Sequence, residues 1–167
     1  MKSKYYYHFT NDTLRNGEPI PKVGEWLEFL GELVPCPSEF DLARGAGGLH
    51  ASEHPFDALS FASGNRLHRV ELGDQIVQHG SPVDKVVSNR RKIVASIDAE
   101  DVLRRFDLRV ALDWKDAPAI VRDYLETGDE SKRDAAWAAA WAKYRQWFAE
   151  MVDEEFANQK GGDKYPA

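Results

Sequence analysis

The sequence predicts an α+β protein in which a mainly antiparallel β core is followed by a C-terminal three-helix segment. Residues 1–97 carry most of the glycines, all but two of the prolines and several short β-type runs. From Asp98 onward, the chain instead shows helix-capping residues and helical spacing of apolar residues. We expect a single domain over residues 1–160, made of a β-rich core over 1–97 and a helical part over 98–159. A disordered tail is expected at 160–167.

Composition limits the class of protein. The chain has 167 residues, of which 43% are hydrophobic, and this is enough to bury a core within one domain. Its net charge of −6 argues against general nucleic-acid binding, which needs an excess of cations. Cys36 is the one cysteine, so neither an internal disulfide nor a multi-cysteine metal site is expected. No run is as long and apolar as a membrane span, and we expect a cytoplasmic protein without a membrane partner.

Short alternating runs predict the strands of the β core. The segment RLHRVELGD alternates cleanly over residues 66–74, with Leu67 on one side and His68, Val70 and Leu72 on the other. The glycine-rich segment SEFDLARGAGG reads as a loop over 38–48. Further strands are expected within 5–11, 25–35, 48–52 and 84–97.

Capping residues mark the three helices of the second half. Asp98 is a candidate N-cap for the first helix. Pro118 lies near the start of the second helix and Gly128 near its end. Asp129 caps a long third helix that continues to Phe156.

The long helix carries an aromatic stripe. Its apolar residues follow one another at alternating spacings of four and three, which places them on one face. They are Trp137, Trp141, Tyr144, Phe148 and Met151. The stripe either packs on the rest of the domain or forms a surface for a homodimer or another partner, because aromatic residues anchor interfaces.

The segment from His50 to His54 reads H-x-x-E-H, which is a zinc-hydrolase spacing. Such a site needs both histidines on one face of a helix. Pro55 follows His54 directly and disfavours the helical conformation at that residue. We therefore expect His50 to end a strand and Ser52–Pro55 to turn into a helix, with no metal site.

The expected order of strand, turn, helix and strand over residues 48–74 resembles the central segment of ADP-ribosyltransferase folds, including the poly-ADP-ribose polymerases. The N-terminal YYYHFT resembles the first strand of that fold, whose tyrosine–histidine pair grips NAD. The resemblance implies a cofactor-binding set made of Tyr7, His8, Thr10, His50 and Ser52. It places His8 on the ribose and His50 where the family has a tyrosine that stacks on nicotinamide.

The chain departs from the family pattern at three points. Phe9 replaces a glycine that lets the backbone approach the ligand, and His50 replaces the tyrosine. The catalytic glutamate has no clear counterpart on the later strand. Glu71 and Asp84 are the available acids and, with His8 and His50, make up the candidate catalytic set. Loss of the acid removes electrostatic support for nicotinamide departure.

A second resemblance covers nearly the whole chain. The sequence is similar to a group of uncharacterised small proteins from phages and prophages, which implies a phage-linked gene. The shared segments are 17–26, 49–59, 70–76, 85–93 and 124–131.

A short basic run lies in the last predicted strand. Arg90 and Lys92 should point to one side of it and Arg91 to the other. The run is either a solvated edge or a contact for phosphate or a partner.

Two functions from different classes follow from these features. The first is a non-catalytic interaction module that binds a host or defence protein in the bacterial cytoplasm and needs no cofactor. Its contacts would come from the aromatic stripe and from Arg90, Arg91 and Lys92. The alternative is a NAD-dependent ADP-ribosyltransferase or NAD glycohydrolase, with NAD as substrate.

Overall fold

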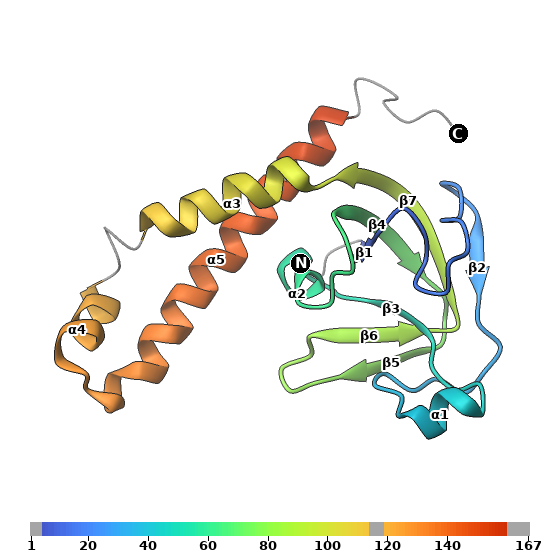
Figure 1. Ribbon diagram of the computed structural model, residues 1–167, viewed down its shortest axis with the longest axis horizontal. Helices are drawn as coiled ribbons and strands as arrows, with labels where there is room; N and C mark the ends of the chain where they lie inside the picture. Colours follow the sequence, from blue (N-terminus) through green and yellow to red (C-terminus); the bar gives the residue numbers. More distant parts are fainter. Residues whose placement is uncertain (1–4, 114–118, 160–167) are drawn as a thin grey trace.

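Figure 1 shows the computed structural model of the chain, which describes residues 5–113 and 119–159. It contains two antiparallel sheets and, after them, a group of three helices, as the sequence predicts. The expected tail at 160–167 lies outside the described residues. None of the described helices is both long enough and apolar enough to cross a membrane.

The first sheet holds four strands, each pairing antiparallel with its neighbours. Across the sheet these are β1 (Tyr6–Thr10), β4 (Arg66–Leu72), β7 (Arg90–Asp98) and β2 (Trp26–Glu28). His8 of β1 lies directly opposite His68 of β4. The pairing of β4 with β7 shifts between Arg69 and Val70, where β7 bulges by one residue.

The second sheet is smaller and is joined to the first through the backbone of β1. Its strands, in order, are β3 (Leu49–Ala51), β6 (Lys85–Ser88) and β5 (Ile76–His79). The backbone of Tyr7 exchanges two hydrogen bonds with Ser52, at 2.8 and 2.9 Å, so β1 contacts both sheets. Only Asn89 separates β6 from β7.

Helices cover one face of the first sheet. Phe9, Leu67 and Ile97 point to this face and pack against Phe148 and Val152 of the last helix. On the opposite face, a second cluster contains Val70 and Ile93 together with Ala51 and Val86 of the second sheet. The two faces of the first sheet are therefore both buried in part, one by helices and one by strands.

The three C-terminal helices are α3 (Glu100–Asp113), α4 (Ala119–Thr127) and α5 (Glu130–Gln159). Figure 1 places α4 beside the first half of α5, away from the two sheets. The predicted cap at Asp98 is confirmed by its Oδ1 atom, which accepts a hydrogen bond from the Glu100 amide at 2.9 Å. Gly128, between α4 and α5, has a φ of 65°, which suits a glycine at the end of a helix.

One local prediction was wrong. Residues 38–48, predicted as a loop, contain the short helix α1 (Glu39–Ala43), which Ser38 and Asp41 start with a reciprocal capping box. Within 25–35, β2 confirms that the segment contributes a strand rather than a helix. A second short helix, α2 (Pro55–Leu59), begins where the turn after β3 was expected to lead into a helix.

Candidate functional site

A group of histidines and one arginine lies on the face of the first sheet that is turned toward the second sheet. Side chains alternate along β1 and β4, so His8 and His68 point away from the helix-covered face that holds Phe9 and Leu67. His68 shares its side of β4 with Val70, which packs against the second sheet. The sheet register therefore places two histidines side by side in the interior.

His68 is a buried histidine whose two ring nitrogens are both hydrogen-bonded. Its Nε2 atom lies 2.8 Å from Thr10 Oγ1, and its Nδ1 atom lies 2.7 Å from Ser96 Oγ. The Thr10 hydroxyl also donates to the Asn11 carbonyl, so His68 Nε2–H is the donor to Thr10 and Nδ1 accepts from Ser96. Burial lowers the pKa of His68 to about 3, with a further contribution from nearby Arg91. This histidine is neutral and structural.

His8 differs from His68 because its ring has no hydrogen-bond partner among the described residues. It is half-buried. Burial and then the positive charge of Arg91 hold the pKa of His8 well below its usual value. His8 is therefore a neutral imidazole with one donor and one acceptor still available.

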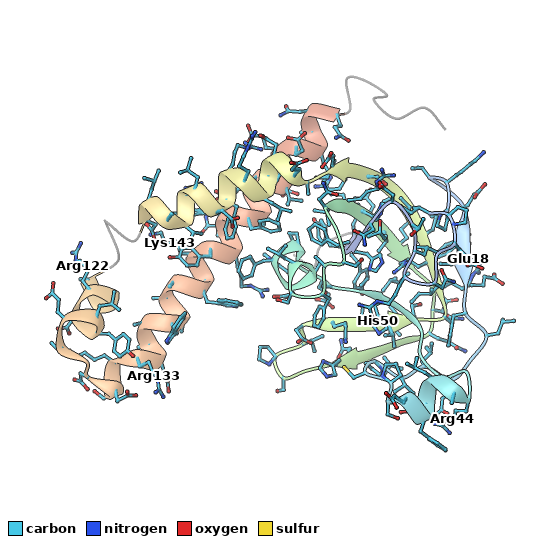
Figure 2. The ribbon with its side chains drawn as sticks, viewed as in Figure 1. Glu18, Arg44, His50, Arg122, Arg133 and Lys143 are labelled. Atoms are coloured by element: carbon cyan, nitrogen blue, oxygen red, sulfur yellow. The ribbon has the colours of Figure 1, made fainter. Side chains whose placement is uncertain are left out.

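His50 lies inside the β core on β3 (Figure 2), and its contacts link three segments of the chain. Its Nε2 atom donates to the Pro35 carbonyl at 2.9 Å. Its backbone carbonyl accepts a hydrogen bond from the Arg91 guanidinium at 2.6 Å. Burial lowers the pKa of His50 as well, although the bond to Pro35 opposes this shift.

Arg91 is the charged centre of this group. Its side chain is only 7% exposed, and burial lowers its pKa to about 10. Within the described part of the chain, no carboxylate lies within 4.0 Å of its guanidinium. A buried charge without a counter-charge is costly, so this arrangement needs an explanation.

Lys85 is a second buried cation, on the neighbouring strand β6. It is 8% exposed, and its Nζ atom donates to Cys36 Sγ at 3.1 Å and lies 4.5 Å from the centre of the Phe61 ring. No described carboxylate pairs with it. The interior thus holds two cations with no carboxylate in contact, although the Lys85 charge contributes to the lowered pKa of the neighbouring Asp84.

The two acids proposed for catalysis do not join His8. Glu71 lies on the opposite side of β4 from His68 and pairs with Lys92 at 2.6 Å. Asp84 lies in the turn between β5 and β6, where it accepts a hydrogen bond from His79 Nδ1 at 3.0 Å. The structure places neither acid beside the histidines.

The predicted cofactor-binding residues divide between the two faces of β1. His8 and Thr10 share the side turned toward the second sheet, and Thr10 is committed to His68. Tyr7 belongs to the helix-covered core. Ser52 is buried and bonds through its backbone to Tyr7.

The predicted partner-binding residues are also divided. Trp137 and Trp141 are 57% and 49% exposed, Tyr144 is half-buried, and Phe148 is fully buried in the core. Phe148 therefore cannot contact a partner, because it fills the space between α5 and the sheet. On β7, Arg91 is buried, whereas Arg90 and Lys92 emerge on the other side and lie 4.6 and 4.9 Å from the Trp26 ring.

The H-x-x-E-H segment folds as the sequence predicts. His50 is in the strand, and His54 is the N-cap of α2, where its Nδ1 atom accepts a hydrogen bond from the Phe56 amide at 3.2 Å. Over residues 5–113 and 119–159, no group of three His, Cys, Asp or Glu side chains is arranged to hold a metal ion.

Sequence reasoning missed His68 and Lys85 as members of this interior group. The signal for His68 was present, since it alternates in register with Val70 and Leu72, which are apolar. Lys85 gave no such signal, because its burial depends on Cys36 and Phe61, which are distant in sequence.

Comparison with known families gives one match. Residues 5–105 match a family described as Domain of unknown function (DUF7666). The chain belongs to this family. The DUF7666 region contains both sheets and the start of α3, and α4 and α5 follow it. No curated protein and no solved structure matches the chain.

Proposed function

We propose that this DUF7666 protein is a non-catalytic interaction module that binds another protein through its helical arm. The arm is defined here as α4 and the first half of α5, residues 119–144. The observation that carries the proposal is the exposure of Trp137 and Trp141 on this arm, at 57% and 49%. Exposed tryptophans gathered on one element are typical of interface anchors.

The position of the arm supports this proposal. Trp141 contacts Phe56 edge-to-face, with ring centres 4.8 Å apart, so it is held in place while half of its surface faces solvent. Leu125 of α4 is 58% exposed and adds apolar surface to the same arm. Figure 1 shows that the sheets leave this end of the molecule uncovered. A host or defence protein of a bacterial cell is the partner that the resemblance to phage and prophage proteins suggests.

The proposed core is ADP-ribosyltransferase-like but without the acid that transfer needs. Glu71 pairs with Lys92 on the side of β4 that faces away from His8 and His68, and Asp84 pairs with His79 in a hairpin turn. The positive charge that develops on the ribose of NAD as nicotinamide leaves would therefore lie near cations, and no carboxylate beside His8 would stabilise it. We expect no turnover of NAD.

A NAD-dependent transferase or glycohydrolase remains the second candidate, and the free ring of His8 favours it. That reading predicts cleavage of NAD by the purified protein and loss of cleavage in His8→Ala. It also predicts a rise in Tm with millimolar NAD, because a ligand well above its Kd stabilises the folded state.

The test places a photo-crosslinking residue at position 137 and, as a control, at position 30, where Leu30 is 95% exposed on the β side. We expect one bacterial protein to cross-link at 137 and not at 30. The double change Trp137→Ser and Trp141→Ser should abolish its binding to the purified chain while circular dichroism stays unchanged. Cross-linking to a second copy at 137 would instead show a homodimer. NAD cleavage by the purified protein would contradict the non-catalytic assignment.

A further inference from the structure

The interior of the β core holds two cations that form no ion pair with a described carboxylate. Arg91 and Lys85 are 7% and 8% exposed and have no carboxylate partner in residues 5–113 and 119–159. The chain is not short of acids, since it carries 28 Asp and Glu residues against 22 Lys and Arg. Cations that are buried away from this excess of carboxylates point to a negative charge supplied from outside.

Arg91 has hydrogen-bonding capacity to spare. A guanidinium carries five N–H donors, and the one hydrogen bond of Arg91 runs from a terminal nitrogen to the His50 carbonyl. Its Nε atom and second terminal nitrogen bond to no described residue, yet they are not among the buried atoms that lack a partner. These donors are therefore unpaired but not completely shielded from solvent.

His8 supplies a second unused group beside Arg91. Arg91 donates to the carbonyl of His50, two residues before Ser52, whose backbone pairs with Tyr7 beside His8. The guanidinium therefore ends near the part of β1 that carries His8, and its charge adds to the lowering of the pKa of His8. The His8 ring forms no hydrogen bond to the described protein, whereas its neighbour His68 is fully bonded to Thr10 and Ser96. One histidine of the pair is structural, and the other is available.

We propose that Arg91 and His8 form a binding site for a small oxyanion of the phosphate class, between the two sheets of the β core. The planar guanidinium matches two oxygens of such an anion, and the imidazole donates to a third. A free phosphate and the phosphate of a nucleotide present the same group. This site is independent of the helical arm and of any partner that binds there.

The test uses the full chain and inorganic phosphate as the probe, against sodium chloride of equal ionic strength. We expect phosphate to raise the Tm and to shift the NMR signals of the His8 ring and the Arg91 Nε–H group. Arg91→Lys and His8→Phe should each weaken binding about tenfold or more, as the loss of a charge-assisted or buried hydrogen bond predicts. Arg90→Gln is the matched control, because Arg90 lies on the other side of the same strand and contacts Trp26.

Nucleotide probes and further variants complete the test. ADP binding more tightly than phosphate, with no binding of adenosine, would identify the source as a nucleotide, and equal binding of ADP and phosphate would identify the free anion. If Arg91→Lys fails to fold, His8→Phe and the NMR shifts decide alone. No shift at His8 and Arg91, or equal loss of binding in Arg90→Gln, would overturn the proposal. Unchanged binding in Trp137→Ser would separate this site from the helical arm.

Discussion

At the scale of single residues, His68 shows how the β core holds a buried polar ring. Its two nitrogens are matched to the hydroxyls of Thr10 and Ser96, so the ring is satisfied without a charge. His8, directly opposite it, is left without a partner. The same residue type therefore has both ring nitrogens hydrogen-bonded at one position and neither at the position opposite.

Replacing His68 with leucine should destabilise the fold. The change leaves the partly buried hydroxyl of Ser96 without its partner and deprives the buried Thr10 hydroxyl of a donor, and an unsatisfied buried group costs about 1–3 kcal/mol. We expect the free energy of unfolding in urea to fall by about 2 kcal/mol or more. His79→Leu is the control, since His79 pairs with Asp84 in an exposed turn and its loss should matter little. Equal losses in the two variants would contradict the structural role of His68.

Stability should also fall as the solution becomes mildly acidic. The pKa of His68 is about 3 in the folded protein and near 6.5 when unfolded, so the unfolded state binds the proton first. His8 has a pKa that is lowered in the same direction. The stabilisation is complete above about pH 6.5 and is lost as the pH falls from there toward 3, by up to about 1.4 kcal/mol per pH unit for each histidine.

Urea titrations between pH 7 and 4.5 measure this slope. The carboxylates with lowered pKa, such as Asp41, contribute mainly below their ordinary value near 3.8, outside this window. His68→Gln should make the slope shallower. A slope that is the same in the variant, or zero in the native chain, would rule out the neutral buried histidine.

At the scale of elements, α5 has two roles along its length. Its second half buries Phe148, Val152 and Phe156 against the first sheet, whereas its first half packs against α4 through Ala136 and Ala140. The aromatic stripe predicted from spacing is therefore continuous in sequence but divided in structure. One end is core and the other is exposed at Trp137.

Two substitutions on this one helix should separate the roles. Phe148→Ala removes a fully buried ring that packs edge-to-face on Phe106, with centres 5.1 Å apart, and should cost about 3–5 kcal/mol of stability. Trp137→Ala should change stability little, because the residue is mostly exposed. Chemical denaturation of both variants checks this. Similar losses at the two positions would show that the arm is part of the core.

At the scale of the whole molecule, the family match ends before the folded unit does. The DUF7666 match ends at residue 105, yet α5 supplies the apolar side chains that cover the first sheet. Removing α5 would expose Phe9, Leu67 and Ile97, which are all nearly inaccessible to solvent in the full chain. The matched region therefore depends on a helix that lies outside it.

We expect a fragment of residues 1–113 to lose cooperative thermal unfolding, because burial of that face is the main source of its stability. A fragment of residues 1–159 should unfold like the full chain, since it keeps all of α5. Circular dichroism melts of the two fragments measure this. A cooperative transition in the shorter fragment would show that the sheets form a stable unit without α5.

The sequence by itself determined the features that depend on neighbouring residues. Alternation over 66–74 predicted β4, the caps at Asp98 and Asp129 predicted helix starts, and Pro55 predicted the turn that breaks the zinc spacing. The same local rules missed α1, because its capping box was concealed in a glycine-rich segment. His8 and His50 were selected by a resemblance rather than by local rules, and their role in a binding site stays a prediction.

Only the tertiary structure decided which of these residues meet. The pairing of β1 with β4 set His8 against His68, and closure of the second sheet brought the carbonyl of His50 to Arg91. The register of β1 against β4 likewise decides that Glu71 and His8 lie on opposite sides of the sheet. Contacts between residues 40 to 60 positions apart are fixed by sheet pairing and burial together, and no local spacing encodes them.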